Sequence, residues 1–69
     1  MRLKVGDLVT QKHWHHALPE CNLGLGKVVE AVPQAQVRVR WQGGRLLYEN
    51  IASLKKISPL VALAMMADA

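Results

Sequence analysis

The sequence predicts an all-β fold of five short strands that close into a small barrel, followed by a short helical tail. Three features indicate this: a strictly alternating segment over residues 37–42, a Gly-Gly pair after it, and a Ser-Pro pair before a C-terminal apolar run. Closure is favoured because it removes the exposed edges of a sheet of short strands. We expect the barrel to span residues 1–58 and the tail residues 59–69.

The alternating segment separates apolar from polar side chains. One face holds Val37, Val39 and Trp41, and the other holds Arg38, Arg40 and Gln42. This period of two is typical of a half-buried antiparallel strand. Gly43-Gly44 then predicts a two-residue type I′ turn, because both central positions of that turn need positive φ. The chain returns over residues 45–48 as the fourth strand.

The other strands follow from β-branched content between turn residues. They are expected at Leu8–Gln11, Lys27–Val32 and Leu54–Ile57, with turns at 33–36 and a single 3₁₀ turn at 49–53. Residues 12–26 show neither helical nor strand periodicity. A connection of this length without regular structure tends to be functional.

The tail has different chemistry. Ser58-Pro59 predicts a helix cap with proline at the first helical position. Leu60–Ala67 is helix-prone but apolar on every side, and so short a helix is not stable alone in water. It therefore packs on the barrel, packs on another subunit, or frays. Because Cys21 is the only cysteine, no internal disulfide can supplement the small core, and this favours a homo-oligomer formed through Leu60–Ala67.

The net charge of +4 favours anionic partners in a general way, although the basic residues are spread along the chain. A lone cysteine without a readable secretion signal indicates a cytoplasmic protein. The longest apolar run is too short to span a bilayer, so we expect no membrane partner.

The segments Val5–Val9, Gly24–Val29 and Val37–Trp41, with Gly43-Gly44-Arg45 and the closing 54–57, follow a recurring order of turns and strands. The chain thereby resembles the SH3-like barrels of Tudor/KOW type in bacterial transcription and repair proteins, such as CarD-like and helicase C-terminal Tudor-like domains. It also resembles small bacterial proteins of the same build. The resemblance covers roughly residues 3–57 and implies a five-stranded SH3-like barrel from a bacterium or phage. It implies little about function, since such barrels bind RNA polymerase, DNA, RNA or peptides.

A more distant resemblance is to the plasmid-borne, trimethoprim-resistant dihydrofolate reductases, which are oligomeric SH3-like chains of similar size. Arg45–Tyr48 falls where their pore-lining Val-Gln-Ile-Tyr strand lies, and Tyr48 matches. The pore glutamine is replaced by Leu46, which cannot hydrogen-bond pterin or nicotinamide. The enzymatic interpretation therefore lacks its key contact.

The candidate binding residues are basic or aromatic and lie on the long connection or the 37–48 hairpin: Lys12, His13, Trp14, Arg38, Arg40, Arg45 and Tyr48. The three arginines are expected on the outer face of the hairpin, as a patch for phosphate or an acidic protein surface; the alternative is an ordinary solvated face. Trp14 is suited to stacking on a base or capping a peptide pocket, or else it anchors its loop.

Metal binding and catalysis have little support. His13, His15, His16 and Cys21 are of zinc-binding types, but no paired ligand spacing is present. Cys21 has no evident group to orient a neighbouring histidine as a base. We expect no metal, no cofactor and no catalytic residue.

The sequence thus favours a non-catalytic binding or adaptor module that contacts nucleic acid or a nucleic-acid-processing protein complex. Two alternatives stay open. One is a homo-oligomeric assembly protein that associates through its apolar tail, and the other is a small reductase-like enzyme built at the centre of an oligomer.

Overall fold

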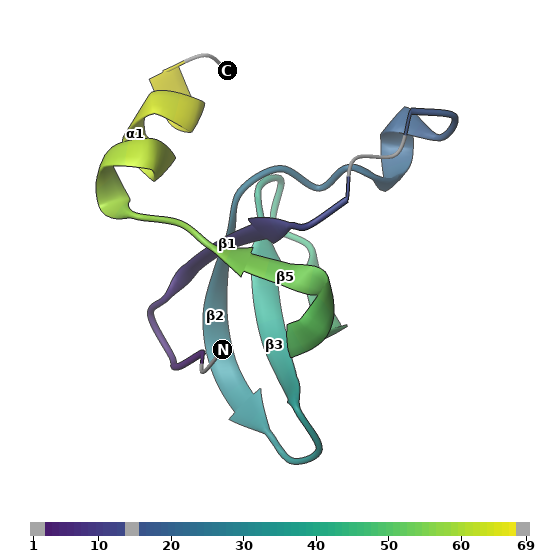
Figure 1. Cartoon of the computed structure of the whole chain (residues 1–69), viewed down its shortest axis with the longest axis vertical. Helices are drawn as coiled ribbons and strands as arrows, with labels where there is room; N and C mark the ends of the chain where they lie inside the picture. The colour runs from purple at the N-terminus through teal and green to yellow at the C-terminus, as the bar shows by residue number, and fades with distance from the viewer. Residues whose placement is uncertain (1–2, 14–15, 68–69) are drawn as a thin grey trace.

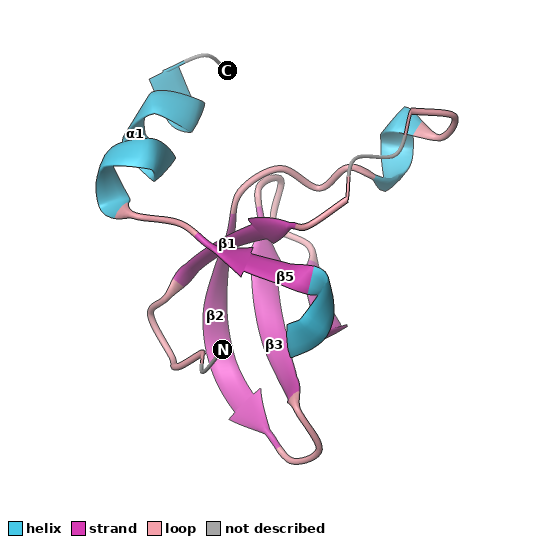
Figure 2. Ribbon diagram, viewed as in Figure 1, coloured by secondary structure: helices cyan, strands magenta, loops and turns pink. Residues whose placement is uncertain are grey.

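The computed structural model of the chain describes residues 3–13 and 16–67. This part of the chain forms one antiparallel sheet with two 3₁₀ helices and a C-terminal α-helix (Figures 1 and 2). The elements in chain order are β1 (Leu8–Gln11), η1 (Pro19–Cys21), β2 (Gly26–Val32), β3 (Gln36–Trp41), β4 (Leu46–Asn50), η2 (Ile51–Ser53), β5 (Leu54–Lys56) and α1 (Pro59–Ala67).

The five strands are ordered β4-β3-β2-β1-β5, and every neighbouring pair is antiparallel. The last strand returns to the first, since Val9 pairs with Lys56 and Gln11 with Leu54. The predicted all-β class with a short C-terminal helix is confirmed. Closure of this sheet into a barrel stays a prediction.

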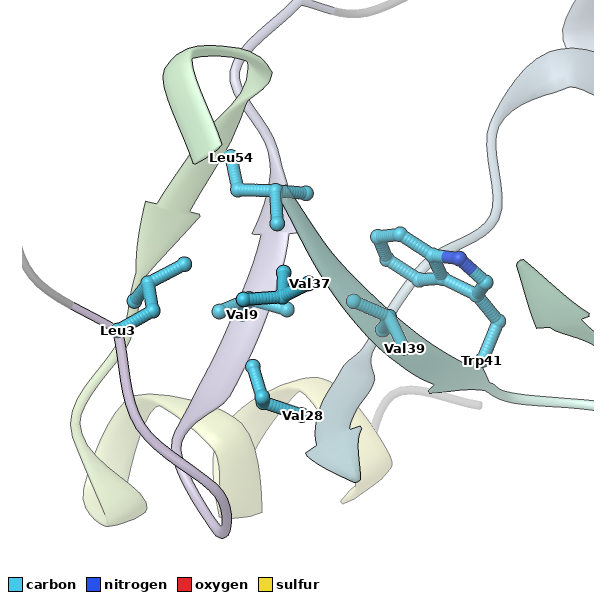
Figure 3. Packing of buried hydrophobic residues seen from close by; sticks show 7 residues of the cluster. All are labelled: Leu3, Val9, Val28, Val37, Val39, Trp41 and Leu54. Carbon is cyan, nitrogen blue, oxygen red and sulfur yellow. The ribbon is translucent and has the colours of Figure 1, made fainter. Parts of the chain in front are cut away.

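The core lies on the inner face of the sheet. The expected inward residues of β3, namely Val37, Val39 and Trp41, are all buried. They are joined by Val and Leu side chains from the N-terminal segment and from β1, β2 and β5, which converge on them in Figure 3: Leu3, Val9, Val28 and Leu54. A core of aliphatic side chains around one tryptophan follows from the small number of aromatic residues.

The β3–β4 connection differs from the expected two-residue turn. Both glycines have positive φ, +91° at Gly43 and +92° at Gly44. However, the Gly44 N–H donates to the Trp41 carbonyl (3.0 Å) and the Trp41 N–H to the Arg45 carbonyl (2.8 Å), so a three-residue turn, residues 42–44, separates the paired Trp41 and Arg45. The reason is that the Gln42 N–H donates to the Leu25 carbonyl (2.9 Å), which takes Gln42 out of the β3–β4 ladder.

Helix α1 begins as the Ser-Pro pair predicts, with the Val61 N–H donating to the Ser58 hydroxyl (3.2 Å). One side of the helix packs on the sheet, and packing of the tail on another subunit stays a prediction. Ala62 is fully buried against Leu25 and Ile57, in a second apolar cluster separate from the main core. The helix follows β5 and lies on the opposite side of Figure 1 from the long β1–β2 connection.

Gly26 in β2 supports the packing of β3, and its replacement tests the core. A Cβ at this buried position would lie 2.5 Å from Val39 Cγ1 and 2.8 Å from Trp41 Cε3. We expect Gly26→Ala to destabilise the fold by about 1–3 kcal/mol, as overpacked cores do. Urea unfolding followed by tryptophan fluorescence measures this, and an unchanged midpoint would contradict the described packing.

Candidate binding surfaces

The side of β2, β3 and β4 that points away from the core carries a mixed basic and aromatic surface. Cross-strand pairing places Lys27 beside Arg40 and Arg40 beside Leu46 in one row. A second row places Glu30 beside Arg38 and Arg38 beside Tyr48. We call these six residues the outer face. Its apolar members are accessible, since Tyr48 is 61% and Leu46 39% exposed.

Arg38 is held between the two other members of its row. Its guanidinium lies 4.0 Å from the Glu30 carboxylate and 5.6 Å from the centre of the Tyr48 ring. Each contact contributes at most about 1 kcal/mol at such an exposed site. Together they neutralise part of the Arg38 charge and cover one face of the Tyr48 ring, while the rest of that ring stays accessible.

Lys27 and Arg40 are exposed neighbours of like charge. Within the described residues neither forms an ion pair. Beside them is an open groove of about 220 Å³, lined by Leu8, Leu25, Gly26, Lys27, Arg40, Trp41 and Gln42. Most of its floor is apolar, so two cationic side chains border a concave apolar surface.

Arg45 does not join Arg38 and Arg40 in the expected patch. A two-residue turn would have placed Arg45 opposite Gln42, on the outer face. The three-residue connection places Arg45 opposite the buried Trp41 instead, because a one-residue shift in register moves a side chain to the other face. Arg45 lies exposed at the end of the hairpin, and its role in binding stays a prediction.

The long connection leaves the sheet and extends well beyond it (Figure 1). The Gln11 side chain joins the beginning of this connection to its end. Its Nε2 donates to the Cys21 carbonyl (3.0 Å), and its Oε1 accepts from the Leu23 N–H (2.8 Å). Pro19–Cys21 forms a 3₁₀ helix that the sequence pattern did not predict. Lys12 and His13 are exposed, and Trp14 lies outside the described residues.

A pocket of about 290 Å³ opens where this connection begins, and Gln11, His13, Glu49 and Ser53 line it. The Glu49 carboxylate accepts a hydrogen bond from the Trp41 indole N–H (3.1 Å). The 3₁₀ turn expected at residues 49–53 would have taken Glu49 out of the fourth strand, whereas Glu49 lies within β4. The signal that identifies it is strand alternation, which places Glu49 opposite the buried Val37 and on the inner side of the sheet.

Two further features, a metal site and a membrane-spanning helix, have no counterpart in residues 3–13 and 16–67. There, no group of three or more His, Cys, Asp or Glu side chains is arranged to hold a metal ion. His15, one of the histidines considered as a ligand, lies outside the described residues. In the same part of the chain, no helix is long and apolar enough to cross a membrane.

No family model, no curated protein and no solved structure matches this chain significantly. Function is therefore argued from the surfaces themselves.

The hydrogen bonds of Gln11 give a direct test of the loop geometry. Gln11→Ala removes the acceptor of the part-buried Leu23 N–H, and we expect a loss of about 1–2 kcal/mol with about tenfold faster hydrogen exchange at the Leu23 amide. Gln36→Ala, at an exposed strand end, is the matched control. Equal exchange at Leu23 in both variants would contradict the role of Gln11.

Proposed function

We propose that this chain is a non-catalytic binding module that holds single-stranded nucleic acid on its outer face. The observation that carries the proposal is the pair of Lys27 and Arg40, adjacent across two strands, exposed and without an ion pair in the described residues, on the same face as the exposed Tyr48. We also propose that the sheet closes as an SH3-like barrel. The return of β5 to β1 in an antiparallel strand order supports this.

Lys27 and Arg40 supply the electrostatic part of such an interface. Because no acidic side chain of the described residues neutralises them, a bound phosphate does not have to displace an internal partner. Their contacts would release counterions from the nucleic acid and make the affinity depend on salt. The net charge of +4 acts in the same direction over longer distances.

Tyr48 supplies a stacking surface. One face of its ring lies against Arg38, and with 61% of the residue exposed a base can reach the remaining face. Stacking of a base on an aromatic ring contributes about 1–3 kcal/mol and needs a base that is not already stacked in a duplex. This favours a single strand over a duplex, with the groove beside Arg40 and the exposed Leu46 available to the apolar face of a second base.

Binding of a fluorescent oligothymidylate, followed by anisotropy over a range of salt concentrations, tests the proposal. We expect the double variant Lys27→Glu/Arg40→Glu to bind more than about tenfold more weakly and to show a shallower salt dependence, since two phosphate contacts are lost. The double variant Lys4→Glu/Lys55→Glu makes the same change of charge at exposed positions outside the outer face. Equal losses in both would indicate diffuse attraction and contradict a site at the outer face.

Two further comparisons sharpen this test. Tyr48→Leu keeps an apolar side chain but removes the ring, and about a tenfold loss of affinity is expected from one stacked base. Duplex DNA of the same length should bind more weakly than the single strand. If the protein instead binds an acidic peptide such as oligoglutamate and not the oligonucleotide, the outer face is a protein-binding surface and the nucleic-acid proposal fails.

A second candidate function is self-association through α1, and the exposed side of that helix favours it. Leu60 is 80%, Leu63 61% and Val61 49% exposed, although all three are aliphatic. Leu60, Leu63 and Ala64 form one stripe at the spacing that packs against another helix. The helix has no charged residue, so two copies can approach through it without repulsion between like charges.

Analytical ultracentrifugation tests this second candidate. We expect the wild-type chain to show a mass above that of the monomer, rising with concentration, and Leu60→Glu/Leu63→Glu to sediment as a monomer because it places charges in the stripe. The control Val5→Glu/Leu18→Glu changes two other exposed aliphatic residues and should keep the wild-type behaviour. A wild-type chain that is monomeric at all concentrations rejects association through α1.

A further inference from the structure

In the pocket formed by Gln11, His13, Glu49 and Ser53, the capacity that Glu49 and Ser53 keep for a ligand is that of acceptors. The Gln11 side chain is held by the long connection through both Nε2 and Oε1, which leaves one Nε2 proton for a ligand. The Ser53 hydroxyl donates its proton to the Asn50 carbonyl (2.7 Å), so it retains only lone pairs. Of the Glu49 carboxylate, Oε2 accepts from Trp41 and Oε1 has no partner among the described residues.

The pocket also carries one uncompensated negative charge. Glu49 is half-buried, and in the part of the chain that the structure describes no cation lies within ion-pair distance of its carboxylate. Of the other acids in the described residues, Asp7 and Glu30 lie beside Lys56 and Arg38, whereas the exposed Glu20 forms no ion pair. A ligand that completes the pocket must therefore supply positive charge and several donors.

We propose that this pocket binds a guanidinium group, the side chain of an arginine in a protein partner. A guanidinium has five N–H donors in a planar fork and no acceptor, which complements acceptors on different walls of the pocket. Glu49 Oε1 and the Ser53 hydroxyl are those acceptors. An ammonium group carries the same charge at a single point and cannot reach several walls at once.

The Trp41 indole prepares the carboxylate for this role. Trp41 is 1% exposed, so its N–H is a fixed donor to the Glu49 carboxylate, which it orients before any ligand arrives. A carboxylate that is already ordered loses little side-chain entropy on binding. A charge-assisted bond to guanidinium is also roughly twice as strong as a bond between neutral groups.

This site is independent of the outer face. Glu49 lies opposite Val37 and on the inner side of the sheet, whereas Arg40 and Tyr48 point away from the core. The chain can thus hold an anionic partner on one face and an arginine on the other, as an adaptor would. Loss of arginine binding and loss of nucleic-acid binding are measured with different ligands and different variants, so either can fail alone.

Titration of the ¹⁵N-labelled chain with N-acetyl-arginine methylamide, followed by NMR, tests the proposal. The reporter is the Trp41 indole N–H signal, distinguished from that of Trp14 by a Trp14→Phe variant. We expect saturable shifts of this signal and of the Glu49 and Ser53 amides. The matching citrulline and lysine derivatives, which lack the charge and the fork respectively, should bind about tenfold more weakly or worse. Equal affinity for either compound, or no saturation with arginine, overturns the proposal.

Glu49→Gln provides the matched variant, because it removes the charge but keeps a side-chain oxygen for the Trp41 indole. We expect E49Q to lose the response to arginine while its unfolding midpoint stays close to that of the wild type. Glu30→Gln removes a charge on the outer face and should leave the response intact. Unchanged arginine binding in E49Q contradicts the site, and the comparison of the three ligands on the wild-type chain decides the matter even if E49Q is unstable.

Discussion

The Trp41 side chain connects the core of this small protein to both of its candidate binding surfaces. It is 1% exposed and packs with Val39, and the absence of a side chain at Gly26 makes room for its ring. Its indole N–H donates to Glu49 at the rim of the sheet. Its backbone closes the β3–β4 connection through bonds with Gly44 and Arg45. A chain of this length buries only about 60% of its unfolded surface. The packing and hydrogen bonds of this one residue therefore constrain much of the fold.

The position at which Trp41 closes the hairpin determines what the outer face contains. Since the connection has three residues, Arg40 pairs with Leu46 and Arg38 with Tyr48, and Arg45 leaves the row. The hairpin therefore contributes two arginines to the outer face instead of three, together with an accessible tyrosine ring in contact with the Arg38 guanidinium. Charge from β2 replaces what is lost, because Lys27 lies directly beside Arg40. The result is a surface that places an exposed aromatic ring beside cationic side chains, which is the combination that the proposed nucleic-acid binding requires.

The two surfaces have opposite electrostatic character for a structural reason. Strand alternation places the basic residues of β3 outward, while Glu49, on the neighbouring strand, points inward and is held there by the indole. The acid is thereby separated from the cations that would otherwise neutralise it. Asp7 shows the contrasting case: it is buried, accepts the Lys4 N–H (3.0 Å) and lies 3.7 Å from the Lys56 ammonium, so it serves the turn before β1.

The sequence by itself determined the all-β class, the place of each strand to within a residue or two, the capped helix and the inward face of β3, because periodicity and turn residues are local properties. It also identified Arg38, Arg40 and Tyr48 as members of one hairpin. Only the tertiary structure decided the hairpin register, the path of the long connection, the pairing of Lys27 with Arg40 and the pocket around Glu49. These depend on contacts between residues distant in the chain, such as Gln42 with Leu25 and Gln11 with Leu23, and no local pattern records which distant groups will meet.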